Sequence, residues 1–214
     1  MAEFNLPIER HRMIWINPAM WATVIAKEPA LANKPLVAGW AGKGWPVISR
    51  RAMCSDEGTM APLGLPLPPA WGKGRLSLRV PFDAIVHDAP APLLSAAAHA
   101  APAAWQGTIA SLVGIDPQVR CFGSLAWQHL TGLDYVTKTS DLDLLWSVSD
   151  AMQANALTQR IGRVAQVAPM RIDGELIAPT GRAVQWIEWR TEAGMVLVKS
   201  TDGVRLVERD EVFQ

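Results

Sequence analysis

Residues 119–147 read VRCFGSLAWQHLTGLDYVTKTSDLDLLWS, and this pattern predicts a strand, a Gly-Ser turn, a short helix, a polar loop and a second strand. Two aspartates, Asp141 and Asp143, fall in the second strand. Because alternate side chains of a strand share a face, both carboxylates point one way while the leucines between and after them point the other. A strand interior disfavours aspartate, and two adjacent carboxylates repel each other. The pattern therefore indicates either a solvated edge strand or a carboxylate pair that binds a divalent cation.

The Gly123-Ser124 pair lies where the first strand ends and the helix begins. Glycine allows another group to approach the backbone closely, and the free amides at a helix start bind anions. The Ser124 hydroxyl adds a donor for phosphate oxygens. Together with the Asp-x-Asp strand, this turn predicts a polyphosphate held beside two carboxylates. Mg²⁺ bridging carboxylates and phosphates is the usual arrangement for phosphoryl or nucleotidyl transfer.

A site with two metal ions needs a third carboxylate from a neighbouring strand. Asp173, in the segment MRIDGEL, is the first candidate, with Glu175 and Glu188 behind it. A second interpretation of Asp173-Gly174 stays open, because this pair is also typical of a tight turn. Lys199, in MVLVKS, is predicted on a strand, where it either faces the phosphates or is solvated.

The N-terminal half of the chain predicts a helix at residues 19–26 that begins at Pro18. Residues 60–74 are so rich in proline and glycine that we expect an extended connector there. Strands are predicted at residues 11–16, 36–40, 45–50 and 75–80, the second and third joined by a Gly-Lys-Gly turn. The DAPAP segment at residues 88–92 is the expected domain boundary, which divides the chain into residues 1–88 and 89–214.

The C-terminal half predicts an alanine-rich helical segment at residues 93–113 that is interrupted at Pro102. A capping box at residues 147–150 opens a helix to about residue 167. Strands are expected at residues 170–173, 176–178, 183–190, 195–200 and 204–207, and Asp202-Gly203 predicts a hairpin between the last two. The fold class is therefore α+β, with a mixed sheet in the C-terminal domain and a smaller N-terminal α/β domain.

The chain has 214 residues, half of them hydrophobic, and its 20 basic residues balance 20 acidic ones. This composition argues against disorder and against a broad nucleic-acid surface. The first twelve residues lack the order of a signal peptide, and no apolar run approaches the roughly 18 residues of a membrane span. With only Cys54 and Cys121, we expect reduced thiols and a cytoplasmic protein, with Cys121 in the core.

Three further groups of side chains were candidates for binding. The basic clusters Arg50-Arg51 and Lys73, Arg75 and Arg79 are either ordinary surface charge or a clamp for a triphosphate or an acidic protein. Trp127 and Trp146 flank the predicted site, where they either stack on a base or pack in the core. The four histidines form no recognisable constellation.

Gly123-Ser124 followed by TSDLDLLW at residues 139–146 resembles the signature of polymerase-β-type nucleotidyltransferases. The longer strings at residues 123–146 and 171–189 more specifically resemble the phosphoribosyl-dephospho-CoA transferase of malonate decarboxylase, a holo-acyl-carrier-protein synthase. RHRMIWI at residues 10–16 and APLGLPLPP at residues 61–69 also fit this family, so the resemblance covers most of the chain.

The resemblance implies a donor, 2'-(5''-triphosphoribosyl)-3'-dephospho-CoA, and an acceptor serine on the carrier subunit of malonate decarboxylase. It also implies Mg²⁺ and pyrophosphate release, with Asp141 and Asp143 as the catalytic pair, Gly123 and Ser124 as the phosphate turn, and Asp173 as the third carboxylate. Two alternatives stay open. One is a nucleotidyltransferase that uses an ordinary nucleoside triphosphate, and the other is a non-catalytic module that binds a carrier protein.

Overall fold

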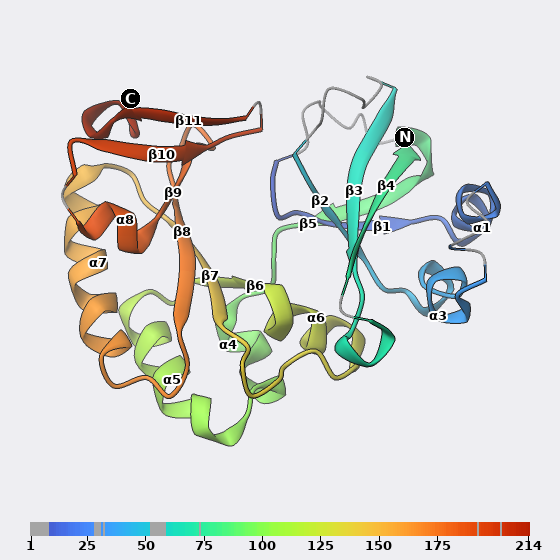
Figure 1. Ribbon diagram of the computed structural model, residues 1–214, viewed down its shortest axis with the longest axis horizontal. Coiled ribbons are helices and arrows are strands. Elements are labelled where there is room, and N and C mark those ends of the chain that lie inside the picture. The colour runs from blue at the N-terminus through green and yellow to red at the C-terminus, as the bar shows by residue number, and fades with distance from the viewer. Residues whose placement is uncertain are drawn as a thin grey trace. The chain divides into compact units, whose positions relative to one another are not determined.

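The computed structural model describes residues 9–27, 31, 33–51, 59–72, 74–191, 193–201 and 203–214. The chain divides into two compact units, Met1–Pro90 and Ala91–Gln214, each with its own sheet (Figure 1). Three residues named above, Cys54, Lys73 and Asp202, lie outside the described residues. Within the described part of the chain, every helix is too short or too polar for a membrane crossing.

The N-terminal unit is built on a five-stranded antiparallel sheet in the order β4-β3-β2-β1-β5. Its strands are β1 (Met13–Ile16), β2 (Val47–Ser49), β3 (Met60–Pro66), β4 (Arg75–Pro81) and β5 (Ile85–Ala89). Its helices are α1 (Pro18–Ala26), α3 (Pro35–Ala38) and the 3-10 turns η1 (Ala41–Lys43), η2 (Pro69–Trp71) and η3 (Phe82–Ala84). Helix α1 starts as predicted, because Pro18 occupies the first helical position and the Asn17 side chain accepts a hydrogen bond from the Ala19 amide at 2.9 Å.

The strand predicted at residues 36–40 is wrong, since this segment contains the short helix α3. Pro35 presets the backbone for a helical first turn, and Leu36 and Val37 are buried by the turn that follows. The predicted Gly-Lys-Gly hairpin turn is instead the 3-10 turn η1, which ends at Gly44 in the left-handed conformation (φ +71°). A short apolar run does not distinguish a strand from one buried helical turn.

The connector predicted at residues 60–74 is also wrong, because its first half is β3, which pairs with β2 and β4. The carbonyl of Pro62 accepts a hydrogen bond from Arg50, so Pro62 directs its backbone groups away from β4. Pro66 lies four residues on and has the same orientation, since backbone groups alternate sides along a strand. Both prolines therefore leave the ladder between β3 and β4 intact.

The C-terminal unit is built on a six-stranded mixed sheet in the order β11-β10-β9-β8-β7-β6. Among its described strands, β7 and β8 run parallel, and the other neighbours are antiparallel. Its strands are β6 (Arg120–Phe122), β7 (Leu142–Ser147), β8 (Ile172–Ile177), β9 (Ala183–Gln185), β10 (Met195–Lys199) and β11 (Val204–Glu208). Its α-helices are α4 (Leu94–Ala97), α5 (Gln106–Ile115), α6 (Gly123–Thr131), α7 (Ala151–Ala165) and α8 (Trp186–Arg190), and its 3-10 turns are η4 (Ala98–Ala100), η5 (Ala103–Trp105) and η6 (Arg209–Glu211).

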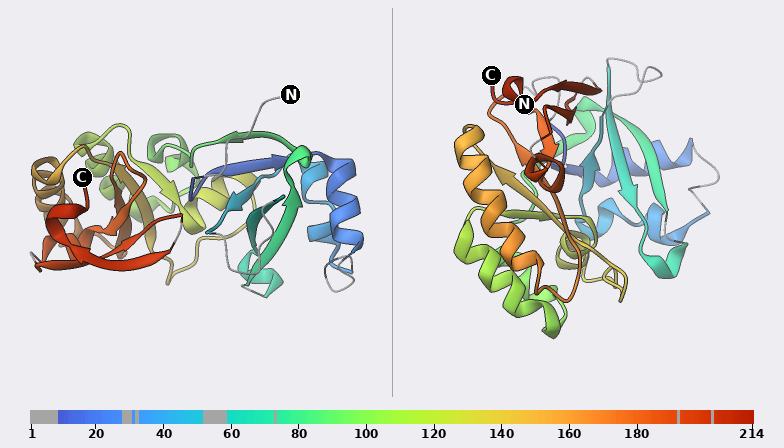
Figure 2. Two further views of the ribbon diagram at one scale, coloured as in Figure 1. Left: turned by 90° about the horizontal axis from the view of Figure 1, so that it is seen from above. Right: turned by 60° about the vertical axis from the view of Figure 1, so that its left-hand side comes forward.

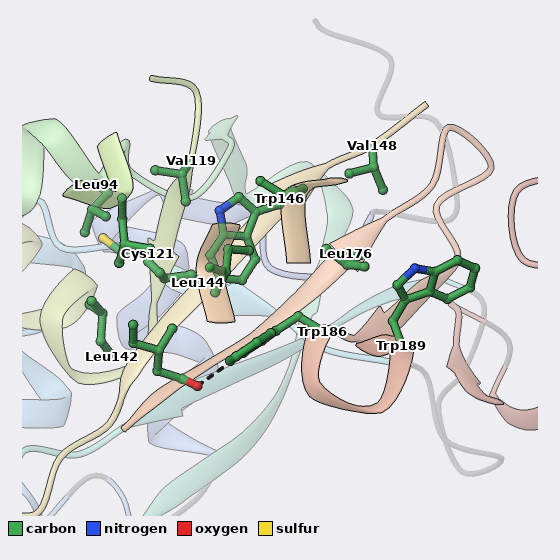
Figure 3. Packing of buried hydrophobic residues seen from close by; sticks show 14 of the residues in the cluster. Leu94, Val119, Cys121, Leu142, Leu144, Trp146, Val148, Leu176, Trp186 and Trp189 are labelled. Atoms are coloured by element: carbon green, nitrogen blue, oxygen red, sulfur yellow. Dashed lines mark hydrogen bonds between the residues drawn. The ribbon is translucent and has the colours of Figure 1, made fainter. Parts of the chain in front are cut away.

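One face of the C-terminal sheet packs on helices, and α5 and α7 run side by side there (Figure 2). Leu142, Leu144 and Trp146 of β7 were predicted to point away from the two carboxylates. They are fully buried in this core beside Leu176 of β8 (Figure 3). The indole of Trp186 donates a hydrogen bond to the Ile172 carbonyl at 3.2 Å, drawn as the dashed line in Figure 3. The predicted strand parity of β7 is thus confirmed.

Three local predictions in this unit need correction. The strands expected at residues 170–173 and 176–178 are one strand, β8. The strand expected at residues 183–190 divides into β9 and the short helix α8. The capping box begins at Asp150, whose carboxylate accepts from the Gln153 amide at 2.8 Å, while the Gln153 side chain accepts from the Ser149 amide at 2.6 Å. The hydrogen bonds from Gln153 and Ser149 lower the pKa of Asp150.

Candidate active site

Three strands bring the predicted site residues together at one end of the C-terminal sheet. Asp143 on β7 is paired with Phe122 at the end of β6 and with Asp173 on β8. Neighbouring strands lie about 4.8 Å apart, and paired residues point to the same face of a sheet. Asp141 precedes β7 by one residue and shares the parity of Asp143. The side chains of Asp141 and Asp173 are 35% and 29% exposed, so both are accessible to a ligand.

Gly123 lies directly against the acidic strand. It has a left-handed backbone (φ +63°), and a Cβ built on it would come 1.8 Å from the Oδ2 of Asp143. Only glycine leaves room for this carboxylate and adopts this conformation without strain. Gly123 is also the first residue of α6, whose N-cap residue, Phe122, has no polar side chain to satisfy the first amides. The start of α6 therefore lies next to the Asp143 carboxylate.

Asp173 and Gly174 are the second and third residues of β8, so the tight-turn interpretation of Asp173-Gly174 is excluded. Its Oδ1 accepts hydrogen bonds from the Gly174 amide and from Nε2 of Gln185, both at 2.9 Å. Gly174 is required here for space, because a Cβ on it would come 2.4 Å from the Leu144 carbonyl oxygen. The strand pairing and the Gln185 side chain together fix the orientation of the Asp173 carboxylate.

Arg171 connects two of the three aspartates. Its guanidinium nitrogens lie 3.4 Å from Oδ2 of Asp141 and 3.6 Å from Oδ2 of Asp173. Arg171 and Gln185 were not among the site residues predicted from the sequence. The signal for Arg171 was its parity, because a residue two positions before Asp173 on a strand shares its face. For Gln185 no local signal existed, since its contact depends on the pairing of β8 with β9.

The other candidates for the third carboxylate lie elsewhere. Glu175 shares the face of Asp173 but is buried, and its Oε1 accepts from Nζ of Lys199 at 2.8 Å. Glu188 lies on α8 and accepts a hydrogen bond from the Leu197 amide at 2.7 Å. Of these three acids, Asp173 alone is the register partner of Asp143. Lys199, predicted to bind phosphate, forms a salt bridge with Glu175 in this structure.

The remaining aromatic and thiol candidates are structural. Trp127 and Trp146 are 1% and 0% exposed, so both indoles pack in the core and neither can stack on a base in this conformation. Cys121 is buried as predicted, and burial, with a smaller contribution from the Asp143 charge, raises the pKa of its thiol to about 12. Such a thiol is not a nucleophile at neutral pH. The rings of His99 and His129 lie 5.1 Å apart, edge to face.

The donor atoms of the site suit a hard cation. Carboxylate oxygens are the ligands that Mg²⁺ prefers, and it commonly binds through one or two carboxylates completed by water and substrate phosphates. Among the described residues, no three or more His, Cys, Asp or Glu side chains gather into a metal site by themselves. Asp143, its register partner Asp173 and Asp141 on the same strand face offer oxygen ligands of the kind that bind Mg²⁺ together with a phosphate-bearing ligand.

Comparison with protein families identifies the chain. Residues 92–210 match the family model described as "Phosphoribosyl-dephospho-CoA transferase MdcG C-terminal domain", and residues 9–91 match the corresponding N-terminal domain. The chain belongs to the phosphoribosyl-dephospho-CoA transferase family. It is therefore an enzyme of the transferase class, and the resemblance stated from the sequence is confirmed.

Individual members of the phosphoribosyl-dephospho-CoA transferase family match over nearly their full length. The chain is 40% identical to the phosphoribosyl-dephospho-CoA transferase of Bradyrhizobium diazoefficiens, over 96% of this chain and 92% of that protein. It is 35% identical to the Xanthomonas campestris protein and 37% identical to the Xanthomonas axonopodis protein of the same name, over 95% of this chain and 96% of each relative. No solved structure matches the chain.

Proposed function

We propose that this transferase moves the phosphoribosyl-dephospho-CoA group from 2'-(5''-triphosphoribosyl)-3'-dephospho-CoA to a serine of the carrier subunit of malonate decarboxylase. The family to which the chain belongs supports the identity of the group transferred. The observation that supports the reaction type is the contact between Gly123 and Asp143, which joins a helix start suited to phosphate with a carboxylate suited to a cation. This combination is the polymerase-β-type arrangement that we propose for the C-terminal unit.

In the proposed reaction the serine oxygen attacks the α-phosphorus, a new P–O bond forms, and the bond to the departing pyrophosphate breaks. The amides at the start of α6 and the Ser124 hydroxyl bind phosphate oxygens. Asp173, oriented by Gln185, is the third carboxylate of the site, and the serine proton passes to solvent water. Arg171 offers a guanidinium to the anionic phosphates when it leaves its carboxylate partners.

Asp141 and Asp143 would hold Mg²⁺ together with the phosphates, and Asp173 would complete a second position. When bound, Mg²⁺ neutralises charge on the transferring phosphate and on pyrophosphate. The role of the chain is then to fix the relative positions of the donor phosphates and the acceptor hydroxyl, which lowers the entropic part of the barrier.

The test is transfer to the purified apo carrier subunit, followed by its mass increase and by pyrophosphate release. We expect dependence on Mg²⁺ and a loss of about 100-fold to 1,000-fold in Asp143→Asn, as for other charge-stabilising groups in transfer sites. Asp134→Asn is a matched control, because Asp134 is an exposed aspartate in the loop before the site. Normal transfer by Asp143→Asn at an unchanged melting temperature would contradict the site assignment.

Two other outcomes would replace the proposal. Turnover of ATP or CTP without any dephospho-CoA compound would indicate an ordinary nucleotidyltransferase. Binding of the carrier subunit without metal-dependent binding of the triphosphate donor, measured by calorimetry, would indicate a non-catalytic carrier-binding module.

A further inference from the structure

The N-terminal unit contains a pocket of about 400 Å³ between helix α1 and the strand β4. Its apolar lining comes from both elements and from the first residue of β3: Met20, Val24, Met60, Leu78 and Pro81. Thr23 and Ser77 add hydroxyl groups to the rim. None of these residues has a role in the transfer site of the C-terminal unit.

Among the described residues, β4 is the edge strand of its sheet, because β3 is the one strand of that part of the chain with which it pairs. The Pro62 carbonyl accepts from Arg50 on the β2 side, and the Leu67 amide donates to Gly74 on the β4 side. Backbone groups alternate along a strand, so the residues of β4 that bond to β3 are 76, 78 and 80. Ser77 consequently directs its N–H and C=O to the outer edge. Pro81, which has no N–H, occupies another outward position, as is typical of edge strands.

An edge strand next to a helix is a common binding site for extended peptides. The peptide adds to the sheet through main-chain hydrogen bonds, and alternate side chains enter the pocket between strand and helix. The charges at this pocket favour an acidic peptide, because Lys27 and Arg79 line it and none of its described lining residues is acidic. Their long side chains place positive charge at the rim of an apolar groove.

We propose that the groove between α1 and β4 binds an extended acidic segment of the carrier subunit, which pairs with β4 as an additional strand. The identity of this partner rests on the proposed function. The strand addition itself rests on the apolar pocket, on Lys27 and Arg79, and on the outer edge of β4 at Ser77, which no described strand pairs with. In this assignment the N-terminal unit recognises the protein acceptor while the C-terminal unit carries the transfer chemistry.

The decisive variant is Ser77→Pro, which removes the outward N–H but no hydrogen bond between β3 and β4. We expect the Kd of the apo carrier subunit to rise at least about tenfold. Proline removes one hydrogen bond to the added strand, and its ring obstructs the pairing of that strand with β4. Ser77→Ala keeps the N–H and should bind within about twofold of the natural protein. A melting temperature of Ser77→Pro close to that of Ser77→Ala shows that the sheet is retained.

A second pair of variants tests the charge. Lys27→Glu should weaken carrier binding severalfold, and more strongly at low salt, because it places a negative charge at the groove. Lys34→Glu is the matched control, since Lys34 is an exposed lysine of the same unit that does not line the pocket. We expect its Kd to match that of the natural protein.

The two proposals fail in different ways. Normal transfer with unchanged carrier affinity in Ser77→Pro and Lys27→Glu would overturn the groove assignment and leave the function standing. Carrier binding that depends on Ser77 without any transfer would overturn the function and leave the groove. A loss of triphosphate-donor affinity with normal carrier affinity would assign the groove to a small anion and would overturn its proposed role.

Discussion

The carboxylate of Asp143 occupies the space that a side chain at Gly123 would need, with Oδ2 only 1.8 Å from the position of a Cβ there. Gly123 is the first residue of α6 and directly follows Phe122, the last paired residue of β6. Asp143 is one of the two aspartates of the Asp-x-Asp strand. A side chain added at Gly123 would displace the Asp143 carboxylate, so the phosphate turn and the acidic strand are packed directly against each other.

Gly123→Ala should therefore reduce transfer by at least about 100-fold, because a displacement of roughly 1 Å at a reacting group has effects of that size. Gly132→Ala is a matched control, since Gly132 also has a left-handed backbone (φ +70°) but no atom within 4 Å of an added Cβ. Both variants should lose about 1 kcal/mol of unfolding free energy from backbone strain, and Gly123→Ala should lose more, because its Cβ also displaces Asp143. Urea denaturation and initial rates would show this, and equal rates in the two variants would contradict the role of the Gly123 contact.

Arg171→Ala should increase the affinity of the free enzyme for Mn²⁺. The guanidinium partly neutralises Asp141 and Asp173, and exposed ion pairs of this kind contribute about 0.2–1 kcal/mol each, so removing both pairs should raise the affinity roughly twofold to thirtyfold. Mn²⁺ titration followed by electron paramagnetic resonance measures this without turnover. Arg163→Ala, on an exposed position of α7, should leave the affinity unchanged. An unchanged affinity in Arg171→Ala would show that the two carboxylates do not contribute to cation binding.

Lys199→Ala should destabilise the protein by roughly 2 kcal/mol, because it leaves the buried Glu175 carboxylate without its ammonium partner. The double variant Lys199→Ala with Glu175→Gln should recover most of that loss, since the buried charge is then removed. Thermal denaturation tests stability, and transfer kinetics test phosphate binding separately. If the KM for the donor stays high in the stabilised double variant, Lys199 also binds the phosphates, as the sequence analysis predicted.

His129 should make the protein less stable in mild acid. Burial and the neighbouring His99 lower the pKa of His129 in the folded state, so protons bind first to the unfolded chain as the pH falls below its ordinary value of 6.5. The free energy of unfolding should therefore decline below about pH 6.5. His129→Gln should show a shallower decline and should respond as the natural protein does above pH 7.5. Parallel curves down to pH 5 would contradict this assignment.

Much of the site was predictable because its signals are local. Strand alternation predicted that Asp143 lies on the other face of β7 from Leu142 and Leu144, and the full burial of these two leucines confirms it. The Gly123 turn followed from the sequence of strand, glycine and helix. The approach of Asp173 to Asp143 depends instead on the parallel pairing of β7 with β8. The sequence identified Asp173 as a candidate, but it did not indicate which residues of the two strands lie opposite each other.

The errors arose where tertiary pairing outweighed local preference. Proline argued against a strand at residues 60–74, yet the orientation of Pro62 and Pro66 is compatible with β3. Residues 36–40 form a short apolar run that fits either a strand or one helical turn, and the chain forms the helical turn α3 that begins at Pro35. Arg171 and Gln185 could be identified as site residues only once the neighbours of Asp173 in space were known.

The parallel pairing of β7 with β8 also has a consequence for biosynthesis. Parallel neighbours cannot be joined by a tight turn, and here the chain passes through α7 before β8 returns to the sheet. A nascent chain emerging from the ribosome therefore has Asp143 long before it has Asp173, and Gln185 follows later still. Premature termination before β8 would leave a polypeptide with the glycine turn and two of the three site aspartates, but without Asp173 and Gln185.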